Sequence, residues 1–130
     1  MKQFSIILAA GLLSLAATSA LVAQEKMAMK EVTVTGEIID TKCYLTGMMG
    51  GQGEDHKQCA IDCIKGGLPV DILEDKTEKV YSIVPKKGMT GANVDTAITK
   101  LIAQKAKLTG MFIEKGGTKM FVYTGVQETK

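Results

Sequence analysis

The chain contains no arginine and no tryptophan, and these two absences narrow the possible functions before any motif is considered. Arginine is the side chain best suited to bidentate recognition of phosphates and base edges, and aromatic rings are the usual stacking partners of bases. Only three tyrosines and three phenylalanines are present, and the formal net charge is +2. We therefore expect no nucleic-acid partner.

Long apolar runs are also scarce. The sequence has one, at the N-terminus. Lys2 precedes the run FSIILAAGLLSLAATSALVA, and the small residues Ala20 and Ala23 offer cleavage points. We interpret residues 1–23 as a signal peptide rather than a retained anchor, since the run includes glycine, serine and threonine and is barely long enough to span a bilayer. The sequence thus predicts a periplasmic or secreted protein, not membrane-embedded once the signal is removed.

The remaining chain is long enough for one domain and too short for two. The polar segment 24–30, QEKMAMK, is expected to be a disordered leader. Strand patterning begins immediately after it. We therefore predict a single domain over residues 31–128.

Five segments of this domain have the composition of β-strands. The first alternates Val32, Val34 and Ile38 with polar neighbours, as a half-buried strand does. Gly36 in this segment and Gly110 in the fourth predict a bend or bulge in two long strands. The segments are 31–39, 69–73, 79–84, 105–114 and 119–126.

An amphipathic helix is expected between the third and fourth strands. Residues 93–104 place apolar side chains at helical spacing, with Asn93 as a plausible N-cap. Five strands with a helix in this position follow the element order of an OB-type barrel. The fold class predicted is therefore mainly β, a five-stranded OB-like barrel, with a β-meander and an appended helix as the alternative.

Histidine and cysteine are rare too, yet the single histidine and two of the three cysteines fall within HKQCAIDC, residues 56–63. We predict a helix over 56–65, with Asp55 as N-cap and Gln58 completing a capping box. At about 100° per residue, His56, Cys59 and Cys63 share one helical stripe. Their side chains are therefore expected to face the same way.

The first interpretation of this stripe is a metal site. Three thiolates and one imidazole are the donors expected for tetrahedral zinc, or for a copper ion assisted by a thioether. The glycine-rich stretch after residue 40 needs something to pin it, and a shared metal ion would do so. The predicted ligands are Cys43, His56, Cys59 and Cys63, with Met48 and Met49 as possible auxiliary ligands.

Two other interpretations remain open. Cys43 could form a disulfide with Cys59 or Cys63, which would staple an OB-like binding or adaptor module for an exported protein partner. Alternatively, one helix cysteine could be a redox-active thiol with Cys43 as its resolving partner and His56 tuning thiolate formation. The chain lacks C-x-x-C and the βαβ order that usually carries it, so we favour no enzymatic activity.

The sequence also resembles a group of small secreted bacterial proteins that have no firmly assigned activity. TGEIIDTKCY, HKQCAIDC and the Gly-x-Pro before the second strand carry the resemblance, which covers most of residues 32–126. It implies a barrel-like β architecture and four soft donors belonging to one site. The matching positions are Gly36, Asp40, Cys43, Tyr44, His56, Cys59, Ala60, Cys63 and Pro69.

Overall fold

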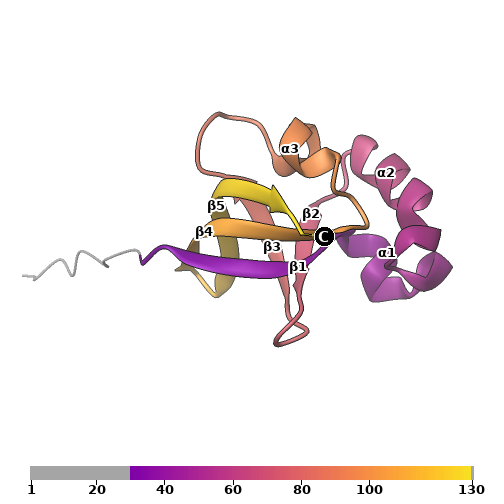
Figure 1. The fold of residues 1–130 in the computed structure, drawn as a ribbon, viewed down its shortest axis with the longest axis horizontal. Helices are drawn as coiled ribbons and strands as arrows, with labels where there is room; N and C mark the ends of the chain where they lie inside the picture. The colour runs from indigo at the N-terminus through magenta and orange to yellow at the C-terminus, as the bar shows by residue number, and fades with distance from the viewer. Residues whose placement is uncertain (1–29, 130) are drawn as a thin grey trace, which may run out of the picture.

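The structure is a computed structural model that describes residues 30–129 (Figure 1). The predicted signal peptide and nearly all of the predicted leader therefore lie outside the described residues. The fold is mainly β, and all five predicted strands are present within two residues of their expected limits. They are β1 (Val32–Asp40), β2 (Val70–Glu74), β3 (Val80–Pro85), β4 (Lys105–Lys115) and β5 (Thr118–Glu128).

The five strands form one mixed sheet that closes into a ring in the order β1-β2-β3-β5-β4. Four of the pairings are antiparallel, and the pairing of β3 with β5 is parallel. A meander would place β3 next to β4, so the alternative topology is wrong. β1 pairs with β2 through one half and with β4 through the other, which closes the ring.

Glycines permit the close strand contacts that this closure needs. A Cβ atom at Gly36 would lie 2.1 Å from the carbonyl oxygen of Leu73, and one at Gly110 would lie 2.2 Å from that of Val122. The β4–β5 register also shifts between Thr109 and Gly110, as the sequence predicted. The extra residue of this bulge lies in β5. Thr109 pairs with Gly125 and Gly110 pairs with Tyr123, which leaves Thr124 unpaired in the ladder.

Short helices fill the connections, and their placement after β1 and between β3 and β4 broadly follows the prediction. Two details of the second helical segment differ. Residues 93–104 do not form one amphipathic helix, and Asn93 does not cap it. Asp95 instead caps the four-residue α3, accepting a hydrogen bond from the Ala97 amide at 2.9 Å. The helical segments are α1 (Thr41–Thr46), η1 (Met48–Gly50), η2 (Glu54–His56), α2 (Lys57–Lys65), η3 (Ala92–Val94) and α3 (Thr96–Thr99).

Tertiary pairing explains why the predicted long helix breaks. Ile102 forms an isolated parallel bridge with Ile38, and the Ala103 amide donates to the Ile38 carbonyl at 2.8 Å. The chain therefore pairs with the sheet at residues where the apolar periodicity predicted a continuing helix. The same apolar residues remain buried, with Ile98 and Ile102 both packed in the core.

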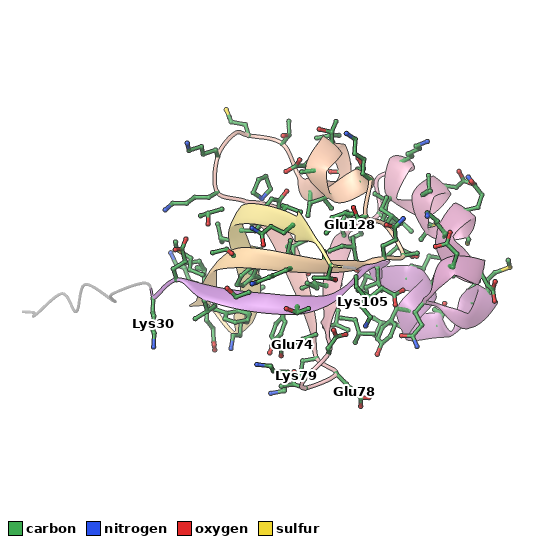
Figure 2. The ribbon with its side chains drawn as sticks, in the orientation of Figure 1. Lys30, Glu74, Glu78, Lys79, Lys105 and Glu128 are labelled. Carbon is green, nitrogen blue, oxygen red and sulfur yellow. The ribbon has the colours of Figure 1, made fainter. Side chains whose placement is uncertain are left out.

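The core fills the ring and extends beneath the helices. Figure 1 shows α1 and α2 together at one end of the sheet, whereas the β2–β3 hairpin projects away from it. Figure 2 shows Glu74, Glu78 and Lys79 on that hairpin, so its projecting tip is charged. The largest buried side chains include Val34, Ile38, Ile64, Ile72, Ile98, Leu108 and Phe121.

None of the helices described between residues 30 and 129 has both the length and the apolar character needed to cross a membrane.

Candidate metal centre

The position of Cys43 is set by a short helix that directly follows β1. Asp40 ends the strand and caps α1, because its Oδ1 accepts a hydrogen bond from the Cys43 amide at 2.8 Å. Gly47 ends the helix in the left-handed conformation, with φ of 68°. The cap and the glycine together hold Cys43 fully buried at the end of the ring.

The opposite wall of the site is α2, which carries the other two cysteines. Its Ala60 and Ile64 are buried against the core, and this leaves Cys59 and Cys63 half-buried on the flank of the helix. Ala60 therefore belongs to the packed face of α2. The packing of α2 fixes the direction in which both thiols point.

The three sulfur atoms converge. Cys43 Sγ lies 3.8 Å from Cys59 Sγ and 3.8 Å from Cys63 Sγ, and all three atoms lie within 4.8 Å of one another. A disulfide bond has a sulfur–sulfur distance of about 2.05 Å, so no pair is bonded and all three cysteines are free thiols. The disulfide of the alternative interpretation is thus not present in the structure.

This spacing is the one that a metal ion requires. Zinc binds thiolates at about 2.3 Å, and tetrahedral angles then separate two ligand sulfurs by about 3.8 Å. Both measured distances from Cys43 have this value. The cluster of Cys43, Cys59 and Cys63, hereafter the thiol cluster, can therefore hold a metal ion without a large displacement of the chain.

His56 belongs to a second, overlapping group. One ring nitrogen of His56, a carboxylate oxygen of Asp40 and Cys43 Sγ all lie within 4.8 Å of one another. His56 does not form a group of this kind with Cys59 and Cys63. The structure therefore brings three of the four predicted donors together. The fourth lies beside Cys43 and is connected to the cluster through it.

The hydrogen bonds of His56 leave one ring nitrogen available. Nε2 lies 3.1 Å from Asp40 Oδ2, and since a carboxylate only accepts, Nε2–H is the donor. Nδ1 is buried and has no hydrogen-bond partner among the described residues, and the side chain is only 1% exposed. A buried nitrogen without a partner is costly, and a metal ion would satisfy it.

The electrostatic environment of Cys43 favours the neutral thiol while no cation is bound. Burial, followed by the hydrogen bond and charge of Asp40, raises the pKa of Cys43 to about 12. A bound metal ion reverses this preference, since its positive charge stabilises the thiolate. Metal binding at this thiol therefore releases a proton.

The glycine-rich connection between the two walls is held by backbone contacts. Gly53 donates its amide proton to the buried carboxylate of Glu37. A Cβ atom at Gly51 would lie 2.8 Å from the Cys43 carbonyl oxygen, which shows how closely the loop packs on α1. The sequence predicted that this loop needs a stabilising interaction, and these contacts provide part of that stabilisation.

One local prediction about the site is wrong. Asp55 and Gln58 do not form a capping box; a 3-10 turn precedes α2, and Gln58 instead bonds Asp62 at 3.0 Å. Met48 and Met49, the possible auxiliary ligands, are 44% and 67% exposed, and their role stays a prediction.

No role was predicted for Asp40 from the sequence, although the residues that follow it have the pattern of a helix start. An aspartate followed three residues later by the first cysteine, with Gly47 beyond, is the pattern of a short capped helix. Asp40 is fully buried and contacts both Cys43 and His56. It thus contacts Cys43, the residue that the two groups of donors share, and also His56.

Comparisons with known proteins add no family: no protein-family model matches the sequence, and no curated protein or solved structure is significantly similar to it.

Proposed function

We propose that this protein binds one thiophilic metal ion, zinc or copper(I), through the thiolates of Cys43, Cys59 and Cys63. The convergence of the three sulfurs at 3.8 Å carries the proposal, because a disulfide would use only two of them. Thiolates are the protein ligands that these two ions prefer. The function is binding of the metal, with no chemical reaction.

His56 is proposed as the fourth ligand, through Nδ1. The Asp40–His56 pair supports this role, since ligating histidines usually donate their other ring N–H to a carboxylate that orients the ring. Zinc requires a fourth ligand, whereas copper(I) is also stable with three thiolates. Occupancy of His56 Nδ1 thus distinguishes the two ions at this site.

An exported location is part of the proposal. Residues 1–23 have the pattern of a signal peptide, and the outside of the cytoplasm is an oxidising environment. Three adjacent free thiols would be vulnerable there. A metal ion that uses all three thiolates fits an odd number of cysteines in such a compartment better than a disulfide, which leaves one thiol over.

We also propose that the closed ring is an OB-type barrel. The strand order, the parallel β3–β5 pairing and the helical segments between β3 and β4 support this assignment. In this fold α1 and α2 are an insertion between β1 and β2. The metal centre would then lie at one end of the barrel.

Metal uptake by the reduced protein tests the proposal. Protein produced from the full sequence is offered zinc and copper(I), and the bound metal is counted by native mass spectrometry. We expect one ion per chain, with affinity reduced by about 100-fold or more in each of the variants Cys43→Ser, Cys59→Ser and Cys63→Ser, because each loses a directly bound thiolate. Met48→Leu and Met49→Leu are the matched controls and should leave the affinity unchanged, since both residues are exposed.

Two results would contradict the proposal and favour the alternatives. A stable protein that takes up neither ion and contains one disulfide would indicate a stapled binding module. A protein that takes up neither ion and cycles between dithiol and disulfide would indicate a thiol redox protein.

A further inference from the structure

We propose that oxidation of the thiol cluster releases the bound metal, through a disulfide that always contains Cys43. This inference rests on the proposed function and describes how the same site is regulated. It makes Cys43 the common partner of two alternative disulfides, one to Cys59 and one to Cys63. Metal occupancy would then depend on the thiol–disulfide balance around the protein.

The equal distances from Cys43 to the other two sulfurs support the shared role. Its Sγ is equally distant, at 3.8 Å, from Cys59 Sγ and Cys63 Sγ. To form a disulfide of about 2.05 Å, Cys43 Sγ and its partner sulfur must come closer by less than about 2 Å. Side-chain rotation of the half-buried helix cysteine can supply much of it.

Cys59 and Cys63 are poor partners for each other. They stand four residues apart on the regular helix α2, where their Cα atoms are about 6 Å apart and both side chains project in nearly parallel directions. A disulfide between them would require distortion of the helix. The buried face of α2, formed by Ala60 and Ile64, opposes such a distortion.

Burial determines which thiol reacts first. Cys43 is fully buried, whereas Cys59 and Cys63 are half-buried and within reach of a small reagent. An external oxidant is therefore attacked by a helix cysteine. Cys43 then acts as the resolving thiol from inside the site.

The oxidant is a low-molecular-weight disulfide. The thiolate of Cys59 or Cys63 attacks one of its sulfurs, forming a mixed disulfide and expelling one small thiolate. The Cys43 thiolate attacks the protein sulfur of the mixed disulfide and expels the second small thiolate. Two protein thiolates lose two electrons, the small disulfide gains them, and zinc keeps its oxidation state.

Loss of two of the three thiolates removes most of the metal site. The remaining thiolate and His56 are too few to hold zinc in competition with a chelator. Release should therefore follow disulfide formation one to one. Zinc is the suitable probe because it has no redox chemistry of its own.

The experiment titrates the zinc-loaded full-sequence protein with hydroxyethyl disulfide under nitrogen. A chromogenic chelator reports released zinc, and peptide mass spectrometry maps the disulfides. We expect one zinc ion released per disulfide, and Cys43 in every disulfide found. In the variants, Cys59→Ser and Cys63→Ser should each still form the other Cys43 disulfide.

The disulfide map of the unmodified protein decides the question without any variant. A predominant Cys59–Cys63 disulfide, or zinc that stays bound after the disulfide is complete, would overturn the inference while leaving the proposed function intact. A reduced protein that never takes up zinc or copper(I) would overturn the proposed function, and the inference with it.

Discussion

At the scale of single residues, Asp40 connects the fold to the candidate metal centre. One carboxylate oxygen accepts from the Cys43 amide and so begins α1, and the other accepts from His56 Nε2. Both partners are themselves buried, as is Asp40. A single side chain thus positions one proposed ligand through the backbone and another through its ring.

Replacement of Asp40 by asparagine separates these two roles. The amide oxygen of Asp40→Asn can still accept from Cys43, but its NH₂ group cannot accept from His56 Nε2–H. Since a carboxylate that hydrogen-bonds a ligating histidine is worth about 10–100-fold in metal affinity, we expect a loss of that size for zinc. Competition with a chelator of known affinity measures it.

Asp71→Asn is the matched control for this prediction. Asp71 is a buried aspartate on β2 whose Oδ2 accepts from the Thr41 hydroxyl at 2.6 Å, and it belongs to neither group of donors. Its variant should retain zinc affinity. Equal affinities in wild type and Asp40→Asn would show that His56 is not oriented by Asp40 for binding.

Tyr123 is the second residue whose environment makes a measurable prediction. Burial, then its hydrogen bond to Asp95 at 2.6 Å, raises the pKa of Tyr123 above its ordinary value of about 10. The folded state therefore favours the neutral phenol. Its contribution to stability is complete below pH of about 10 and is lost as the pH rises through the folded-state pKa.

The variant Tyr123→Phe should show this contribution directly. We expect it to cost about 1–2 kcal/mol near neutral pH, because a hydrogen bond to a carboxylate is lost and Asp95 remains. Between about pH 10 and 11 the wild type should lose stability faster than the variant. Urea unfolding at several pH values measures both, and parallel pH profiles would contradict the assignment.

At the scale of secondary structure, the sequence predicted the strands better than the helices. Alternating apolar residues and glycine turns identify strands locally, and the five strands were found. The helix at α1 was missed because it is only six residues long and its glycine-rich continuation suggested a loop. The helix expected over 93–104 was wrong because Ile102 pairs with β1, a long-range contact that periodicity does not encode.

The site was predictable to a similar degree. The helical spacing of Cys59 and Cys63 placed both on α2, but their convergence on Cys43 depends on how α1 and α2 pack against the ring. The stripe shared with His56 predicted one group of four donors. The 3-10 turn at Glu54–His56 changes the helical phase just before α2, and His56 lies with Asp40 instead.

The glycine loop offers a test at this scale, because two adjacent glycines differ in one respect. Gly50 and Gly51 both have positive φ, but only a Cβ atom at Gly51 would meet the Cys43 backbone. Gly50→Ala should cost about 1–2 kcal/mol from backbone strain alone. Gly51→Ala should cost more and also weaken zinc binding, because it displaces α1.

Denaturant unfolding and zinc competition on both variants check this prediction. The decisive quantity is the ratio of their zinc affinities, since the strain of a positive φ is common to both. If the two variants bind zinc equally well, the loop does not position Cys43.

At the scale of the whole molecule, the candidate metal centre depends on closure of the ring. β1 contributes Asp40 at one end and pairs with both β2 and β4, so its path places α1 opposite α2. Closure requires that strands approach each other at Gly36 and Gly110. The two glycines are therefore part of the architecture that brings the thiols together.

Alanine at these positions should destabilise the ring. Gly36→Ala and Gly110→Ala would place Cβ 2.1 Å and 2.2 Å, respectively, from a backbone oxygen, an overlap that only movement of a strand relieves. We expect a loss of about 3 kcal/mol or more in the free energy of unfolding. Gly125→Ala is the control, since its nearest contact is an ordinary 3.8 Å to Thr109 Cβ, and it should be nearly neutral. Similar losses in all three variants would contradict this explanation of closure.

The central claim is that three cysteines from two helices bind one metal ion. X-ray absorption at the zinc edge of the zinc-loaded, full-sequence protein tests it most directly, because the spectrum counts the sulfur ligands and gives their distance. The account predicts three sulfurs at about 2.3 Å and one imidazole nitrogen at about 2.0 Å. A zinc ion with fewer than three sulfur ligands would contradict it.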